Sequence, residues 1–306
     1  MASTSMAARR LDAPPPALRR RRSGGGRRCG GSHPRRQPLP PPAAAEGLLP
    51  PLPRRARGPT GLGRAAVAGI LSDAAWPPAF PYDAADWRRF DETPDGDFYA
   101  RPRFVFHLDD AAVAAQAAYY ARLTAARGAD ARLPDVLDVC SSWVSFLPAA
   151  YTAAAAAGGV AGGGPRVAGV GLNERELGAN PQLTDHVVLD LNGGATVPRL
   201  PYPDATFDVA VCSVSVDYLT RPREVAAEVA RVLRPGGLFA CTFSNRSFGT
   251  KAVAAWSGGG DADHIYLVGA VLHYAGGGGL FDAPAAIDLS PPGGGDPLYA
   301  VQARRV

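Results

Sequence analysis

From residue 133 onward the chain alternates short apolar runs with longer segments of helical spacing. The runs are VLDVC at 136–140, RVAGVGL at 166–172, HVVLDL at 186–191, FDVAVCSV at 207–214 and GLFACTF at 237–243. They have the length of buried strands and are too short for helices. Two further strands are expected late in the chain, at 286–289 and 298–303. The pattern therefore predicts at least seven strands.

The segments between these runs have the pattern of helices. Ser145–Ala157 is one candidate, and Arg175–Ala179 is a short one that Pro181 interrupts. Residues 222–233 place valines and a leucine on one apolar face, and Pro235-Gly236-Gly237 then stops the helix. The apolar face consists of Val225, Val229, Val232 and Leu233. Strands and helices in alternation predict right-handed crossovers and a parallel, doubly wound α/β sheet, whose ligands bind beyond the carboxyl ends of the strands.

The segment before this sheet is predicted to be a helical N-terminal extension over residues 66–131. Its clearest part is Asp109–Leu123, where Val113, Ala117, Tyr120 and Ala121 recur at helical spacing. Either Asp109 or Asp110 is suited to cap the start of that helix. The sheet-forming domain then occupies residues 132–306.

The first part of the chain differs from the rest in charge. Residues 1–70 hold fourteen arginines and two acids, a local charge of +12, whereas the other residues carry −8. A segment that is Arg-, Ser- and Ala-rich and broken by Pro and Gly buries no core, so we expect disorder. An acid-poor, arginine-rich N-terminus is typical of an organelle transit peptide. We assign residues 1–65 to such a peptide, and the Met-Ala-Ser-Thr-Ser opening favours the chloroplast over the mitochondrion.

The alternative for this segment is a basic arm that binds nucleic acid or an anionic surface. It lacks interleaved aromatic residues, and its removal would leave an acidic protein. We therefore expect no nucleic-acid partner. We also expect no transmembrane segment, because no run approaches the roughly 20 apolar residues that a spanning helix needs.

The cysteines give little support for a metal or disulfide site. Cys29 lies in the basic segment, while Cys140, Cys212 and Cys241 lie in separate strand-like runs without a CxxC spacing. Free thiols are the simpler interpretation. Asp261, Asp263 and His264 form one other conceivable metal set, but a solvated turn that caps the following helix is favoured. We therefore predict no metal.

Two motifs separated by one helix carry a family resemblance. They are LPYPDATFDVAV at 200–211 and RVLRPGGLF at 231–239. With the runs before them, they resemble the class I methyltransferases that use S-adenosylmethionine. The branch with the methyltransferase type 11 domain, including its plant and algal plastid members, is the most similar. The resemblance covers residues 133–245 and more loosely extends to 306. It implies a Rossmann-like seven-stranded sheet with one antiparallel strand at the edge, and S-adenosylmethionine as the cofactor.

The resemblance also implies a set of cofactor-binding positions. In that family the first loop lies under the methionine part of the cofactor, an acid ending the second strand holds the ribose hydroxyls, and an acid after the third strand contacts the adenine. Carried over, the ribose position falls at Asn173 or Glu174, and Ser213 lines the mouth for the methyl donor. The first loop gives Asp138, Cys140, Ser141 and Ser142, and the adenine position gives Asp190 with Leu191 and Asn192 beside it.

This chain departs from the family pattern twice. Where the first loop of the family carries three glycines, the chain has Cys140, Ser142 and Val144. Glycine is used there for unusual dihedrals and for close approach to the ligand. The second departure is Asn173 in place of an acid, which loses a charge-assisted hydrogen bond of about 1.5–3 kcal/mol. Simpler roles stay open: Asp138 and the Ser141-Ser142 pair as helix caps, and Asp190 as a turn residue.

The chemistry expected of such a site is an in-line displacement in which positioning supplies most of the catalysis. A general base is needed only for a protonated acceptor, and the candidates are Asp217, Tyr218, His264 and His273. Trp143, Tyr218 and Trp256 are either acceptor-facing or core residues, and the core is favoured.

Two functions follow from the sequence. The first is an S-adenosylmethionine-dependent methyltransferase whose partner is a small-molecule or otherwise unidentified methyl acceptor. The alternative is a catalytically lapsed protein of the same fold with a binding or assembly role in the plastid. A dinucleotide oxidoreductase is disfavoured because no GxGxxG follows any strand.

Overall fold

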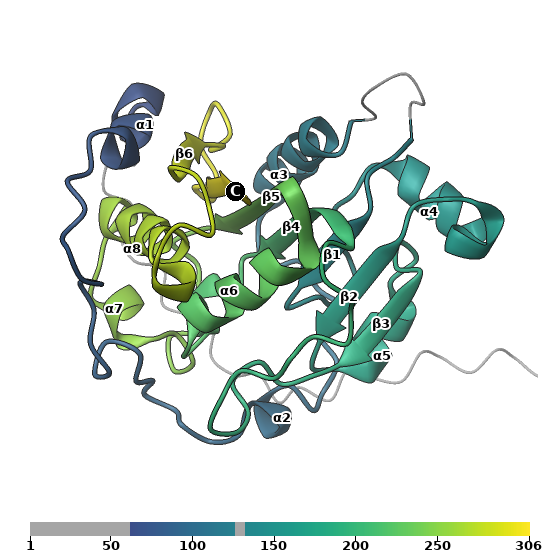
Figure 1. The fold of residues 1–306 in the computed structure, drawn as a ribbon, viewed down its shortest axis with the longest axis horizontal. Coiled ribbons are helices and arrows are strands. Elements are labelled where there is room, and N and C mark those ends of the chain that lie inside the picture. Colours follow the sequence, from purple (N-terminus) through teal and green to yellow (C-terminus); the bar gives the residue numbers. More distant parts are fainter. Residues whose placement is uncertain (1–61, 126–131) are drawn as a thin grey trace, which may run out of the picture. The chain divides into compact units, whose positions relative to one another are not determined.

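The computed structural model describes residues 62–125 and 132–306 (Figure 1). The predicted transit peptide, residues 1–65, therefore lies outside the described residues except for its last four positions. The final six residues of the predicted extension, 126–131, lie outside them as well. Within the described ranges, no helix is long and apolar enough to cross a membrane.

A single sheet of seven strands organises the described residues, in the order β3-β2-β1-β4-β5-β7-β6. The strands are β1 (Val136–Val139), β2 (Val167–Gly171), β3 (Asp185–Val188), β4 (Phe207–Ser213), β5 (Leu233–Phe243), β6 (Ala285–Asp288) and β7 (Tyr299–Arg304). Strands β1 to β5 are parallel, and β7 is antiparallel to both of its neighbours. The predicted doubly wound sheet is confirmed. Its antiparallel strand lies one place in from the edge, because β6 pairs outside it.

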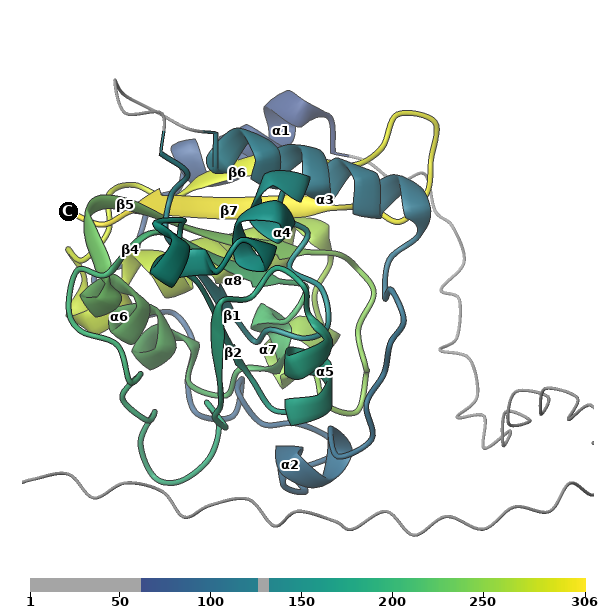
Figure 2. The ribbon, with the colours of Figure 1, turned by 90° about the vertical axis from the view of Figure 1, so that its right-hand side faces the viewer.

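Helices cover both faces of this sheet. They are α1 (Arg64–Ser72), α2 (Asp95–Phe98), α3 (Asp110–Leu123), α4 (Ala149–Ala156), α5 (Glu174–Ala179), α6 (Pro222–Val232), α7 (Ala254–Ser257) and α8 (Asp261–His273). Helices α3 and α4 lie over one face of the sheet, and α6 and α8 lie on the opposite face (Figure 2). One buried cluster joins the sheet to α1, α6 and α8, and a second joins it to α3 and α4. Neighbouring residues of β1 alternate between the two clusters, since Val136 belongs to one and Leu137 to the other. The strand order reverses between β1 and β4, where ligands bind in such sheets.

The predicted helices agree with the structure where their pattern is strongest. The three valines expected on the apolar face of α6 are all buried; Leu233, predicted to share that face, is buried as the first residue of β5. In α3, the Asp109 side chain accepts a hydrogen bond from the Ala112 amide at 2.9 Å, as expected for a cap. The helix predicted from Ser145 begins only at Ala149. Positive φ angles at Cys140 and Phe146, and Pro148 at the cap position, hold the preceding loop out of the helical region.

The extension is less helical than predicted. Between α1 and α3, the only α-helix among the described residues is the four-residue α2. Prolines at 77, 78, 81, 94 and 102 explain this, because proline removes a backbone donor and clashes with the preceding turn of a helix. We call residues 73–109 the lead-in.

A buried ion-pair network fixes the lead-in to the sheet. The Arg89 guanidinium donates to both oxygens of Asp95 at 2.7 and 2.8 Å, and Lys251 Nζ lies 3.2 Å from Asp95 Oδ1. Asn192, in the loop after β3, donates to Asp95 Oδ2 at 2.8 Å. The Lys251 side chain is fully buried and also donates to the Thr93 carbonyl at 2.6 Å. Asp95 therefore joins the lead-in to the loops that follow β3 and β5.

We predict that Asp95→Asn lowers the free energy of unfolding by about 3–5 kcal/mol, because it leaves two buried cations without their shared carboxylate. Urea denaturation measures this loss. Arg199→Gln is the control: it removes an exposed partner of Asp204, 3.3 Å away, and should cost less than about 1 kcal/mol. Equal stability of Asp95→Asn and the wild type would contradict the role given to the network.

Asp217 is a second buried carboxyl group. It lies in the 3-10 turn Val216–Tyr218, which follows β4. Its side chain is 2% exposed, and its Oδ2 atom has no hydrogen-bond partner. Burial raises the pKa of Asp217 to about 8. The folded protein therefore keeps this group protonated at pH values where the unfolded chain has ionised it.

This difference predicts a pH dependence of stability. The contribution of Asp217 is full below its unfolded pKa of 3.8 and is lost as the pH rises through about 8, at about 1.4 kcal/mol per pH unit. Asp217→Asn removes the ionisable group. Its stability relative to the wild type should therefore rise by roughly 2 kcal/mol between pH 6 and pH 8. Urea denaturation at pH 6, 7 and 8 tests this, and a constant difference across the three values would refute it.

Candidate functional site

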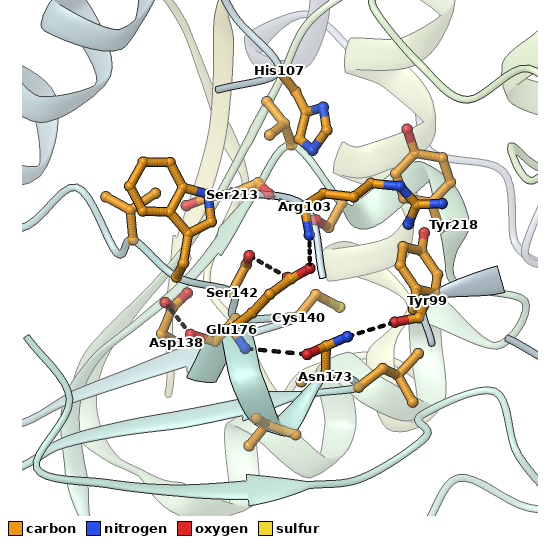
Figure 3. A pocket seen from close by; sticks show the side chains of 18 of the residues that line it. Tyr99, Arg103, His107, Asp138, Cys140, Ser142, Asn173, Glu176, Ser213 and Tyr218 are labelled. Atoms are coloured by element: carbon orange, nitrogen blue, oxygen red, sulfur yellow. Dashed lines mark hydrogen bonds between the residues drawn. The ribbon is translucent and has the colours of Figure 1, made fainter. Parts of the chain in front are cut away.

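A cavity of about 290 Å³ opens at the carboxyl ends of β1, β2, β3 and β4, with the lead-in as its opposite wall (Figure 3). The structure brings nine of the ten predicted cofactor-binding residues to this cavity. They are Asp138, Cys140, Ser141, Ser142, Asn173, Asp190, Leu191, Asn192 and Ser213. Glu174 is not among the lining residues; its side chain is 70% exposed and lies 3.1 Å from His186 Nε2. That the nine residues bind the cofactor remains a prediction.

The first loop bends without glycine. Cys140 has a φ of 58°, in the left-handed region that glycine adopts most readily. Val214, at the end of β4, has a φ of 43°, which is unusual for a β-branched residue. Such conformations cost about 1–3 kcal/mol each and concentrate at functional sites. Two strained residues thus flank the switch point between β1 and β4.

Hydroxyl groups from the first loop converge on Asp138. Ser141 and Ser145 donate to Asp138 Oδ2 at 2.7 and 2.6 Å. Burial raises the pKa of Asp138 to about 6, while these two hydrogen bonds lower it. Since the next helix starts only at Ala149, neither Asp138 nor the Ser141-Ser142 pair caps it. Asp138 instead holds the loop in its bent form.

The last residue of β2 offers the cavity no side chain. The strand ends at Gly171, where a Cβ atom would lie 2.2 Å from the Ser141 carbonyl oxygen. Asn173, two residues later, caps α5 by accepting from the amides of Arg175 and Glu176 at 3.0 and 3.1 Å. Its amide group donates to the carbonyls of Tyr99 and Ala100 in the lead-in, at 2.8 and 3.2 Å. Asn173 therefore joins α5 to the lead-in.

Glu176, in the first turn of α5, is a cavity residue that the sequence analysis missed. Its Oε2 accepts from the Ser142 hydroxyl and its Oε1 from the Arg103 amide, both at 2.6 Å (Figure 3). The available signal was an acid three residues after a capping asparagine, which directs a side chain back over the start of the helix. The carboxylate bridges the first loop and the lead-in.

The loop after β3 forms a turn at Asp190, and its Asn192 side chain links the lead-in to the segment after β4. The Asp190 side chain accepts a hydrogen bond from the backbone amide of Asn192 at 2.9 Å, as expected of a turn residue. It also lines the cavity. The Asn192 side chain donates to Asp95 and to the Tyr218 carbonyl, and it accepts from Thr220. Its polar atoms are thus occupied. Apolar side chains complete this end of the cavity: Val170, Leu172, Leu189 and Leu191.

The lead-in supplies aromatic and basic groups that the sequence analysis also missed. The Arg103 guanidinium lies 4.7 Å from the centre of the Phe98 ring and 5.6 Å from that of Phe248. His107 stands at the rim, with its ring centre 5.1 Å from that of Phe248. Partial burial and the nearby Arg103 and Arg246 lower the pKa of His107. His107 is therefore neutral near pH 7 and able to accept a proton.

The general-base candidates from the sequence fare differently. His264 stacks on Trp256 with ring centres 3.9 Å apart, and His273 stacks on Trp76 at 4.7 Å; neither lines the cavity. Asp217 also lies outside the lining. Tyr218 does line it, but burial and the neighbouring Asp217 raise the pKa of its hydroxyl well above the usual value. None of the four is a proton acceptor in the cavity near pH 7.

Of the three aromatic residues assigned to the core, only Trp256 is fully buried there. Trp143 lines the cavity and belongs to neither core cluster, so the core assignment was wrong for this residue. Tyr218 packs against the core, as expected, and lines the cavity as well. The residues of the conceivable metal set have separate partners: Asp263 accepts from the Gly260 amide, Asp261 from the Tyr299 hydroxyl, and His264 contacts the Trp256 carbonyl. Across the ranges that the structure describes, no three potential ligands are grouped around a metal position.

Comparison with known proteins gives a consistent result. Residues 150–241 match the family model described as a methyltransferase domain. Sterol 4-C-methyltransferase strm-1 of Caenorhabditis elegans is 35% identical over 82 residues, which are 25% of this chain and 24% of that protein. The chain therefore matches about a quarter of the length of this curated relative.

Among solved structures, an S-adenosylmethionine-dependent methyltransferase from Mesorhizobium loti has a TM-score of 0.41 and 17% identity, over 62% of this chain and 98% of that one. The 1,6-didemethyltoxoflavin-N1-methyltransferase of Burkholderia thailandensis also has a TM-score of 0.41 and 17% identity, over 65% and 80% of the two chains. The match over residues 150–241, within a sheet of seven strands, makes this part of the chain similar to a methyltransferase domain, and that similarity implies S-adenosylmethionine as the cofactor.

Proposed function

We propose that the protein is an S-adenosylmethionine-dependent methyltransferase that acts on an apolar small-molecule acceptor in the chloroplast. The observation that carries the proposal is one cavity with two chemically different parts. Its inner part, at the strand ends, has carboxylates and leucines, and its rim has exposed apolar side chains from the lead-in and half-buried aromatic ones from the first loop. An inner polar site under an apolar mouth suits a nucleoside cofactor beside an apolar acceptor.

The residues at the strand ends fit the cofactor. The leucines at 172, 189 and 191 offer apolar surface to a flat base, while Glu176 and Asp190 offer carboxylates to hydroxyl and amino groups. The volume of about 290 Å³ is near the lower end of the roughly 300–1,000 Å³ typical of ligand sites. S-adenosylmethionine, when bound, supplies a methyl group on a positively charged sulfur.

The rim supports an apolar acceptor. Val105 and Phe106 line the rim and are 55% and 46% exposed. The Phe106 ring centre lies 4.9 Å from that of Trp143 and 6.0 Å from that of Phe146. Exposed apolar clusters of this kind mark binding surfaces. The C. elegans relative is named for methyl transfer to a sterol, which is itself an apolar acceptor.

The residues of the chain serve such a reaction mainly by position. The rim holds the acceptor and excludes water, and the left-handed residues Cys140 and Val214 set the course of the backbone at the switch point. For an acceptor that loses a proton, His107 is the base, because it stands at the rim and is neutral near pH 7.

A binding or assembly protein that has lost turnover is the second candidate. It is favoured by the engagement of Asp138, Asn173 and Asn192 in contacts within the protein, together with the absence of glycine from the first loop. The two candidates differ in one respect: only the methyltransferase requires the cofactor.

Titration calorimetry decides between them. We expect S-adenosylhomocysteine, the demethylated cofactor, to bind the full chain with a dissociation constant in the micromolar range. Asp190→Ala should weaken binding about tenfold or more, since a hydrogen bond to a charged group contributes about 1.5–3 kcal/mol. Asp282→Ala, an exposed change of the same kind far along the sequence, is the control. The absence of any heat with the wild type would favour the binding protein.

The chloroplast location is proposed from the acid-poor, arginine-rich N-terminal sequence. A fluorescent protein fused behind residues 1–65 should accumulate in chloroplasts, whereas a fusion carrying only residues 66–306 should not. Protein recovered from the organelle should start beyond the arginine-rich segment. An intact start at Met1 or Ala2 in that material, or accumulation in mitochondria, would overturn the proposal.

A further inference from the structure

Three acidic or amide side chains follow β2, one at the cap of α5 and two in its first turn, and their positions differ sharply. The strand itself ends without a side chain at Gly171, and the Ser141 carbonyl fills the space that a Cβ atom there would need. A carboxylate at that position is therefore sterically excluded. Any group that holds the ribose hydroxyls must come from elsewhere.

Two of the three side chains are committed to other partners. The Asn173 amide makes four hydrogen bonds, two within α5 and two to the lead-in. Glu174 points away from the cavity and interacts with His186 on β3. Asn173 is therefore occupied, and Glu174 does not line the cavity.

Glu176 is the third side chain, and it does line the cavity (Figure 3). The Ser142 hydroxyl and the Arg103 amide each donate to a different oxygen of its carboxylate, at 2.6 Å. These two donors, from the first loop and the lead-in, fix the orientation of the carboxylate. A carboxylate oxygen accepts two hydrogen bonds, so each oxygen retains one acceptor position.

From this arrangement the structure assigns to Glu176 the recognition of a vicinal pair of hydroxyl groups, the ribose diol of the nucleoside. The assignment rests on the proposed function. Two neighbouring hydroxyls match the two oxygens of a fixed carboxylate, and the bonds are strengthened by its charge. The acid moves from the end of the strand to the first turn of the following helix, five residues along the chain.

The ammonium group of the cofactor's amino-acid part is the competing ligand for Glu176. Three nucleosides separate the two: S-adenosylhomocysteine, its 2′,3′-dideoxy analogue, and 5′-methylthioadenosine, which has the diol but no ammonium group. Calorimetry with the full chain compares the wild type with Glu176→Gln. We expect the substitution to weaken the binding of S-adenosylhomocysteine and of methylthioadenosine by the same factor, about tenfold or more. The affinity for the dideoxy analogue should stay unchanged.

Further variants guard the result. Glu224→Gln, the same change on the exposed side of α6, is the neutral control, and Glu174→Gln tests the position nearer to the strand. Glu176→Asp keeps the charge on a shorter side chain. It should therefore weaken the binding of the two ligands that have the diol, and leave the binding of the dideoxy analogue unchanged. Melting temperatures confirm that each variant is folded, and the Asp variant carries the test if the Gln variant does not fold.

Several outcomes overturn the assignment. If Glu176→Gln bound S-adenosylhomocysteine more weakly but methylthioadenosine as tightly as the wild type, Glu176 would be shown to bind the ammonium group. A loss of affinity for the ligands with the diol in Glu174→Gln would place the diol elsewhere, and so would the absence of such a loss in Glu176→Gln. Both outcomes leave the proposed function intact. Failure of the wild type to bind any of the three nucleosides would remove the proposed function, and the assignment with it.

Discussion

The loop after β1 lies against the last residue of β2 so closely that only glycine fits there. The Ser141 amide donates to the Val170 carbonyl at 2.7 Å, and the Ser141 carbonyl occupies the side-chain space of Gly171. To reach this position the chain must turn at Cys140 in the left-handed conformation. One close contact thus accounts for two features: the strained bend of the first loop, and the absence of an acid at the end of the second strand.

The second constraint is the attachment of the lead-in. It has few helical hydrogen bonds of its own, so its course depends on what its backbone and side chains meet. Asp95 fixes it through Arg89, Lys251 and Asn192, and Asn173 fixes it a few residues later through the Tyr99 carbonyl. Two asparagines at strand ends, where a ligand-binding role was expected from the resemblance, therefore build the wall of the cavity.

The parts of this structure that the sequence predicted are those with local signals. Buried strands show as apolar runs, and α6 shows its apolar face at helical spacing, so the strands and this helix followed from the pattern, whereas the antiparallel strand followed from the resemblance. The nine predicted residues gathered at the cavity for the same reason, since they were placed by strand ends. The irregular lead-in has no period, and its contact from Arg103 to Glu176 spans 73 residues. Sequence spacing gave no indication of such a pair, nor of the left-handed bend at a cysteine.

The cavity has an inner part and a rim because two kinds of segment build it, the regular sheet with its loops and the irregular lead-in. The sheet and its loops determine the inner part, where a cofactor common to a superfamily would lie, and their positions are set by hydrogen-bonded registers. The lead-in determines the rim, where the acceptor would lie, and its position is set by a few buried polar contacts. Glu176 belongs to both, because one oxygen accepts from the first loop and the other from the lead-in. Movement of the lead-in would therefore change the orientation of the same carboxylate that we assign to the nucleoside, which couples the two halves of the site.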